Sequence, residues 1–93
     1  MKSFYLDNDM SHLYFANCEK RSDEEEYEEI MSILRNANCK IGKSIMGPDC
    51  DVIECEIDGV SFDVIHTIDG DGTFLYCNHK AGMKKLECIF TEV

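Results

Sequence analysis

The predicted fold is built around the segment DVIECEI-DG-VSFDVIHTI-DGDG-TFLYC, which covers residues 51–77. Its three runs are rich in β-branched and aromatic residues, which favour strands. Asp58-Gly59 separates the first two runs, and Asp-Gly is a strong signal for a two-residue hairpin turn. A longer turn of the same composition, residues 69–72, separates the second run from the third. The stretch therefore predicts a three-stranded antiparallel meander with strands at 51–57, 60–68 and 73–77.

On both sides of this meander, the sequence contains a segment in which apolar residues recur at helical spacing. Upstream, Ser22 is a good N-cap, Glu25 follows three residues later, and apolar residues recur at helical spacing as far as Ala37. Downstream, Asn78 predicts the start of a second helix, in which Met83, Leu86, Ile89 and Phe90 share one side. We therefore expect helices over about 22–38 and 79–91.

The N-terminal part contains two aromatic-rich runs, residues 2–6 and 12–16, that predict a hairpin. A short strand at 39–45 is also expected. The length of 93 residues supports one hydrophobic core rather than two. The sequence therefore predicts a single α+β domain over residues 1–93, in which two helices pack on an antiparallel sheet.

The charge of the chain is strongly acidic, with 19 Asp and Glu against 9 Lys and Arg and a formal net charge of −10. Nucleic-acid backbones and anionic lipids are bound by Lys and Arg, so we expect no direct nucleic-acid binding. No run approaches the roughly 18 apolar residues that cross a bilayer, so no membrane association is expected. The balance of charge favours a basic protein partner.

The number and positions of the cysteines indicate in which cellular compartment the protein is expected. The chain has six cysteines, at positions 18, 39, 50, 55, 77 and 88. The first ten residues lack the apolar run of a secretory signal, and several cysteines fall inside apolar segments, where Cys acts as a small hydrophobe. We therefore expect reduced thiols and a cytoplasmic protein.

Turn lengths predict which residues share a face of the sheet. A two-residue first turn pairs Cys55 with Phe62, and a four-residue second turn pairs Ile65 with Tyr76. One face is then almost entirely apolar. The other carries a row of Val52, Ile65 and Tyr76, a row of Thr67 and Phe74, and carboxylates beside them.

An apolar and aromatic strip bordered by carboxylates is typical of an interface for a basic partner. The alternative is that a loop or helix covers the strip. The residues predicted to bind the partner are Val52, Glu54, Glu56, Asp63, Ile65, Phe74 and Tyr76.

Metal sites and catalysis are less favoured. The Asp-Gly pairs at 69–72 resemble half of a calcium loop, but position 78 is Asn where such a loop requires Glu. A zinc site could draw on Cys50, Cys55, Cys77, His66 and His79, yet their spacing is not that of a zinc motif. We therefore expect no cofactor, no metal and no enzymatic activity.

In size, acidity and absence of catalytic motifs, the chain is similar to bacterial immunity proteins that inhibit toxins; this similarity maps no individual residue. The favoured function is therefore a non-catalytic inhibitor of a basic toxin nuclease. The alternatives are a phage-type inhibitor that mimics nucleic acid, a small metal-dependent or thiol enzyme using Cys77, His79 and His66, and a structural subunit that pairs through an edge strand. The oligomeric state is left open.

Overall fold

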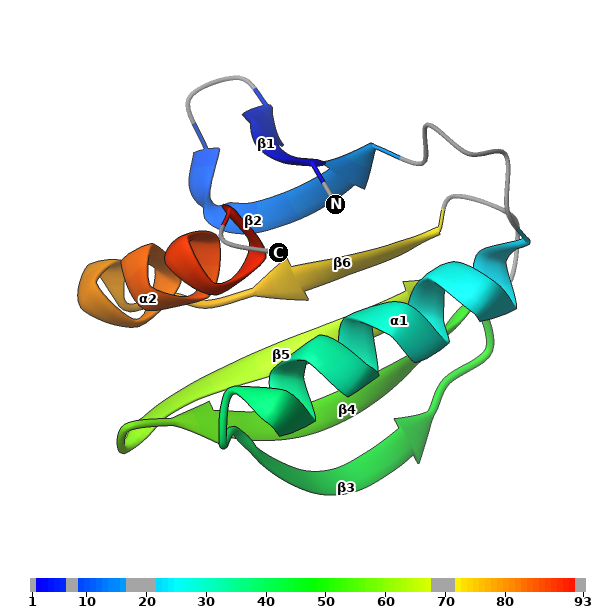
Figure 1. Cartoon of the computed structure of the whole chain (residues 1–93). Coiled ribbons are helices and arrows are strands. Elements are labelled where there is room, and N and C mark those ends of the chain that lie inside the picture. Colours follow the sequence, from blue (N-terminus) through cyan, green and yellow to red (C-terminus); the bar gives the residue numbers. More distant parts are fainter. Residues whose placement is uncertain (1, 7–8, 17–21, 68–71, 92–93) are drawn as a thin grey trace.

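The computed structural model describes residues 2–6, 9–16, 22–67 and 72–91. Six antiparallel strands form one sheet in the order β1-β2-β6-β5-β4-β3 (Figure 1). The elements along the chain are β1 (Lys2–Leu6), β2 (Asp9–Ala16), α1 (Asp23–Asn36), β3 (Lys40–Met46), β4 (Cys50–Ile57), β5 (Val60–Thr67), β6 (Thr73–Tyr76) and α2 (Lys80–Thr91). The expected α+β domain, with its meander, N-terminal hairpin and two helices, is confirmed.

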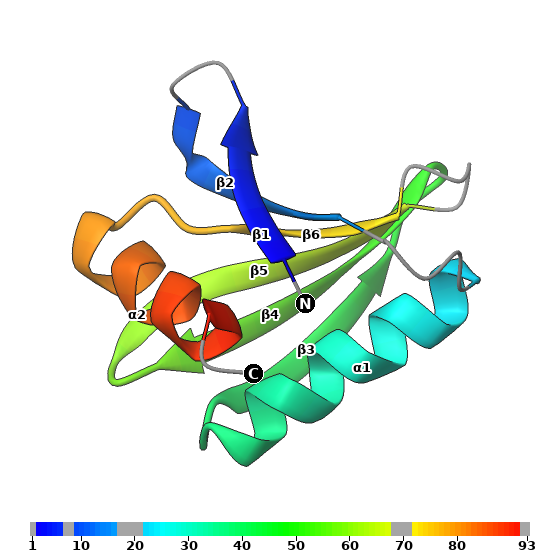
Figure 2. The same ribbon diagram turned by 45° about the horizontal axis from the view of Figure 1, so that its top comes forward.

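Both helices lie against the same face of the sheet (Figures 1 and 2). The sheet curves around them, so that β1 and β2 approach α2 while β3 and β4 lie beside α1 (Figure 2). Tyr5 on β1 connects the N-terminal hairpin to α2, because its hydroxyl donates a 2.8 Å hydrogen bond to the Glu87 carboxylate. The fold therefore has two layers, with helices on one side of the sheet only.

The helix boundaries follow from local hydrogen bonding. Ser22 is the N-cap of α1, as expected, and its hydroxyl accepts a hydrogen bond from the Glu25 amide at 3.3 Å. Helix α2 begins at Lys80, and the His79 carbonyl accepts the amide of Met83 at 2.9 Å. His79 therefore precedes the helix, and the prediction that Asn78 is its cap was wrong by one residue.

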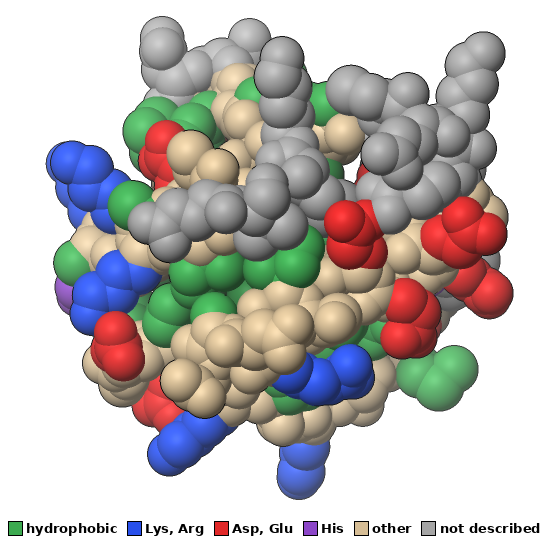
Figure 3. All heavy atoms as spheres, in the orientation of Figure 1, with side chains coloured by type: hydrophobic (Ala, Val, Ile, Leu, Met, Phe, Trp, Pro, Cys, Tyr) green, Lys and Arg blue, Asp and Glu red, His purple; other side chains and the backbone are tan. Residues whose placement is uncertain are grey.

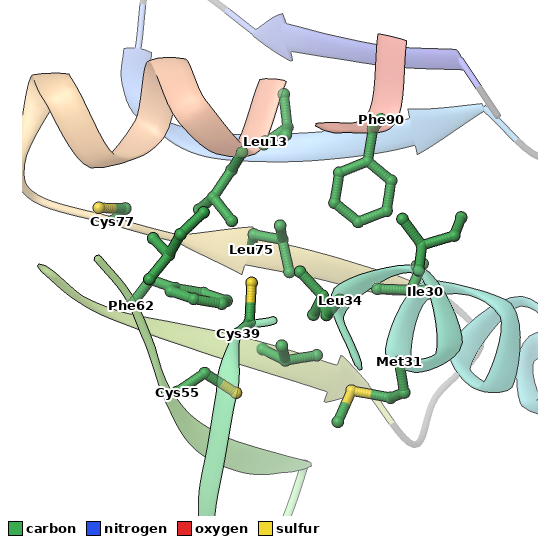
Figure 4. Packing of buried hydrophobic residues seen from close by; sticks show 14 of the residues in the cluster. Leu13, Ile30, Met31, Leu34, Cys39, Cys55, Phe62, Leu75, Cys77 and Phe90 are labelled. Atoms are coloured by element: carbon green, nitrogen blue, oxygen red, sulfur yellow. The ribbon is translucent and has the colours of Figure 1, made fainter. Parts of the chain in front are cut away.

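The core lies between the two helices and the concave face of the sheet (Figure 4). Leu13, Val64 and Leu75 from the strands and Leu34 and Leu86 from the helices are fully buried. These positions alternate along the strands and recur at helical spacing in the helices, which is the pattern that the sequence predicts.

Gly82 explains how closely α2 approaches the sheet. A Cβ atom at this position would lie 2.6 Å from Cγ1 of Val60 and 3.1 Å from Sγ of Cys77. The absence of a side chain therefore allows contact between the helix backbone and β5, and this packing offsets the low helix propensity of glycine.

The register of the first hairpin is as predicted. Cys55 pairs with Phe62 and Ile57 with Val60. Asp58 and Gly59 have φ values of 48° and 83°, the positive values that a type I′ turn requires.

The register predicted for the second hairpin was wrong by two residues. Ile65 pairs with Phe74, and Tyr76 pairs with Asp63. The reason is that the hairpin closes at Thr67, whose amide and hydroxyl both donate to the Gly72 carbonyl, at 3.0 and 2.6 Å. Residues 68–71, which include most of the predicted turn, lie outside the described residues. Because the shift is an even number of residues, every side chain keeps its predicted face.

Candidate functional site

An apolar row crosses all six strands on the sheet face that points away from the helices. Side chains alternate along a strand, and the neighbours Leu13, Val64, Leu75 and Ile53 are buried in the core, so the row itself faces outward. Successive strand pairings join its members, and the Tyr14 and Phe74 rings stand 5.3 Å apart. The apolar row consists of Phe4, Tyr14, Phe74, Ile65, Val52 and Ile45.

The apolar row is open to solvent. Its two ends are the most exposed, with Phe4 40% and Ile45 51% accessible. No helix or strand among the described residues lies over it (Figures 1 and 2). Five strand spacings of about 4.8 Å give a row about 24 Å long, and exposed apolar patches are a common feature of interaction surfaces.

A polar row runs beside the apolar row and consists of His12, Tyr76, Asp63 and Glu54. Strand pairing places His12 opposite Tyr76, Tyr76 opposite Asp63, and Asp63 opposite Glu54. Glu56 lies one step further along β4, opposite Ser61 and Lys40. The carboxylates therefore border one flank of the apolar row.

His12 is held in the polar row by aromatic contacts and hydrogen bonds. Its ring lies 4.8 Å from the Tyr76 ring and 5.8 Å from the Phe74 ring. Its Nδ1 atom is 2.8 Å from Asp9 and 3.1 Å from the Ser11 hydroxyl. Hydrogen bonds from Ser11, and then from His12, lower the pKa of Asp9 to about 2.

The trio of Asp9, Ser11 and His12 does not form a catalytic relay. Serine hydrolases place the acid and the nucleophile on opposite ring nitrogens of the histidine. Here both Asp9 and Ser11 contact the same nitrogen, Nδ1. The trio therefore orients the imidazole within the sheet face, which leaves its ring packed against Tyr76.

The facing carboxylates of Glu54 and Asp63 lie in a shallow hollow of about 780 Å³. Burial, and then the charge of Glu54, raise the pKa of Asp63. Among the described residues, no Lys or Arg forms an ion pair with either carboxylate, and Lys40 reaches only Glu56, at 3.9 Å. Lys40 also lines this hollow, where it pairs with Glu56, so the carboxylates of Glu54 and Asp63 are the acceptors left for a cation from a partner.

All seven residues predicted to bind a partner lie on this outer face. Val52, Ile65 and Phe74 are consecutive members of the apolar row. Tyr76 was predicted to lie in one row with Val52 and Ile65. It lies instead beside Asp63, because the second hairpin closes earlier than expected.

Strands β1, β2 and β3 contribute residues to this face that were not predicted from the sequence: Phe4, His12, Tyr14 and Ile45. Alternation in the two aromatic runs could have shown that Phe4 and Tyr14 face one way and that Tyr5 and Phe15 face the other. It could not have shown which strand β2 joins.

The side chains considered for zinc binding or thiol catalysis do not converge on one point within the described residues. The Cys77 thiol lies in the core and contacts the carbonyls of Ser61 and His79, at 3.6 and 3.4 Å. His66 lies opposite Thr73 in the sheet. Thr73 is four residues before Cys77, and four residues of extended chain span about 13 Å, so His66 lies far from Cys77. Within the described residues, no group of three metal-ligating side chains converges.

The described cysteines, at positions 39, 50, 55, 77 and 88, are free thiols, and Cys18 lies outside the described residues. Burial is the main reason that the pKa of Cys55 is raised to about 11. A thiol with a raised pKa is a poor nucleophile at neutral pH, so Cys55 has the properties of a packing residue.

The helix side of the molecule carries both signs of charge. Asp and Glu side chains gather where α1 begins, whereas Lys and Arg lie mainly around α2 and near β3 (Figure 3). Part of this charge is paired internally, since Lys85 on α2 contacts Asp58 at 2.9 Å. The helix side is therefore a less uniform electrostatic surface than the carboxylate flank of the outer face.

In comparisons of the chain with protein-family models, curated proteins and solved structures, nothing matched. Among the described residues, the helices are α1 and α2, and neither is long and apolar enough to cross a membrane.

Proposed function

We propose that this protein binds a basic protein partner through its outer sheet face and thereby blocks the partner. The observation that carries the proposal is the open apolar row, bordered on one flank by the facing carboxylates of Glu54 and Asp63. Like charges placed opposite each other weaken a sheet, and a cationic partner would remove that repulsion. The apolar row would supply the buried contact area, and the carboxylates would supply specificity and a fast association rate.

The partner class that this chemistry favours is a toxin nuclease. A nuclease must hold a phosphate backbone, so its cleft is lined with Lys and Arg. A small acidic protein that covers such a cleft prevents the substrate from binding. In this proposal the protein is a bacterial immunity protein that acts in the cytoplasm, uses no cofactor and contacts no nucleic acid itself.

The proposal can be tested by capture with matched variants. The protein is immobilised, and partners are captured from its host's lysate at about 0.05 M and about 0.5 M salt, which differ strongly in charge screening. The variant Glu54→Gln/Asp63→Asn removes two charges from the outer face. The control Glu24→Gln/Glu28→Gln removes two charges from exposed positions of α1.

The expected result is one basic protein that binds the natural chain and the control, binds the outer-face variant weakly, and elutes at high salt. Capture that is equal for both variants would contradict the proposal. If a partner is captured, its nucleic-acid-degrading activity should fall as the protein is added. A partner that has no such activity would contradict the assignment to a nuclease.

A further inference from the structure

The arrangement of the outer face also indicates which side chains a partner should bring. We propose that the partner places an apolar side chain on the centre of the apolar row and an arginine in the hollow between Glu54 and Asp63, with its guanidinium against Tyr76. This inference rests on the proposed function and adds to it the chemistry and orientation of the partner's contact residues.

The apolar half of the contact is defined by Phe74, Ile65 and Val52. These three residues are consecutive in the apolar row and are only half-buried, and each has a row neighbour on both sides. Residues at the centre of an interface patch lose the most contact with water on binding and contribute most to affinity. The centre of the row is therefore the place for the partner's apolar side chain.

The charged half of the contact lies one row away. Asp63 has Tyr76 on one side and Glu54 on the other, so an aromatic ring and two carboxylates occur in sequence across three strands. The hollow at Glu54 and Asp63 provides room for a side chain, because Gly42 and Ser61 in its wall are small, and the Lys40 side chain that also lines it pairs with Glu56 rather than with these two carboxylates. A planar guanidinium can stack on a ring and pair with carboxylates at the same time, whereas an ammonium group is a compact, strongly hydrated charge.

The two halves fix the orientation of the partner. In the described strands, the carboxylates of the outer face lie on one flank of the apolar row, and the row on the other flank has Cys50 opposite Thr67. A partner turned by 180° would place its arginine over these uncharged side chains. Loss of the ion pairs would disfavour that orientation.

The test uses three short probes that differ in one side chain: the acetylated, amidated dipeptides Phe-Arg, Phe-Lys and Phe-Gln. Each is titrated into the ¹⁵N,¹³C-labelled protein and followed by NMR. Dissociation constants should be roughly millimolar for ligands of this size. We expect Phe-Arg to shift the signals of Val52, Glu54, Asp63 and Phe74, with nuclear Overhauser effects from the probe ring to the Ile65 and Val52 methyl groups.

Phe-Arg should bind about three- to fivefold more tightly than Phe-Gln and more tightly than Phe-Lys, in line with an exposed ion pair and a cation–π contact. This preference should disappear in Glu54→Gln/Asp63→Asn and persist in Glu24→Gln/Glu28→Gln. Equal binding of the three probes, or shifts centred on α1 or α2, would overturn the inference.

This outcome is distinguishable from failure of the proposed function. If the protein binds Phe-Arg at the outer face but captures no basic partner, the proposed contact site is supported and the proposed function is contradicted. If the protein captures a basic partner through other residues and shows no preference for arginine, the proposed contact site is contradicted and partner binding is retained.

Discussion

Asp63 on β5 lies directly opposite Glu54 on β4, so two carboxylates face each other on the open side of the sheet. Burial, and then the charge of Glu54, raise the pKa of Asp63. Pairs of like charge at such positions destabilise a sheet, and proteins accept local costs of this kind mainly at functional sites. The pair therefore connects the stability of the fold with the binding role proposed for its outer face.

The first prediction is that Asp63→Asn stabilises the fold at neutral pH. The folded state raises the pKa of Asp63, so stability is lost as the pH rises through the unfolded and then the folded pKa of this group. The uncharged variant should increase the free energy of unfolding at pH 7 by about 0.2–1 kcal/mol, the range for cross-strand pairs. Urea denaturation at pH 7 and pH 3 measures the difference.

At pH 3 the gain should be smaller, because Asp63 of the natural protein is then mostly protonated in both states. The exposed Glu28→Gln on α1 is the control for loss of one charge and should show a smaller gain at pH 7. A loss of stability for Asp63→Asn at pH 7 would contradict the repulsion argument.

The second prediction concerns two central aromatic residues of the outer face, Phe74 in the apolar row and Tyr76 beside it in the polar row. Phe74→Ala and Tyr76→Ala should each weaken partner binding by at least about 2 kcal/mol, because central aromatic residues dominate interface energetics. Ile45→Ala, at the exposed end of the row, should cost less than about 1 kcal/mol. Titration calorimetry measures these values, and circular dichroism reports whether each variant is folded. Similar losses at the end and the centre would contradict a centrally bound partner.

The third prediction concerns the contact between α2 and β5. Gly82→Ala should destabilise the fold by about 1–3 kcal/mol, although alanine favours helices, because its Cβ atom would lie 2.6 Å from Cγ1 of Val60. The double variant Gly82→Ala/Val60→Ala should recover part of this loss, which a double-mutant cycle of thermal unfolding would show as coupling. Strict additivity of the two substitutions would contradict the proposed contact.

The fourth prediction concerns the buried carboxylate of Glu26. This side chain is 4% exposed and accepts a 3.1 Å hydrogen bond from the Thr73 amide, which connects α1 to β6. Glu26→Ala should cost about 1–3 kcal/mol, because the buried amide would lose its acceptor. Glu26→Gln keeps an acceptor oxygen and should cost less.

The exposed Glu28→Ala on the same helix is the matched control, and urea denaturation at pH 7 compares the three variants. If Glu26→Ala were no more destabilising than Glu28→Ala, the hydrogen bond to Thr73 would not contribute to stability.

Local signals explain why much of the fold could be predicted. The Asp58-Gly59 turn has a length that its residue types define, so the register of the first hairpin and its faces follow directly. The second turn contains two Asp-Gly pairs, which are compatible with more than one closing pair, and the actual closure at Thr67 and Gly72 shifts Tyr76 from the apolar row to the polar row.

The remaining part of the site depends on contacts that are distant in the sequence. Leu13 pairs with Leu75, and no turn connects β2 to β6, so nothing local predicts that His12 and Tyr14 join the outer face. The β3 contribution, Ile45, depends on a bulge between Ile41 and Ser44, where Gly42 allows the β4 backbone to approach. Apolar alternation indicates the face of each strand, but the order of strands is a property of the whole core.

We propose that the outer sheet face binds a basic protein, and calorimetric titration of the captured partner measures this binding. The natural chain, Glu54→Gln/Asp63→Asn and Glu24→Gln/Glu28→Gln would be compared at about 0.15 M salt. We predict that the outer-face variant binds at least about tenfold more weakly and that the α1 control changes less than about twofold. Equal affinity of the two variants would contradict the claim, because the partner would then sense only the net charge of the protein.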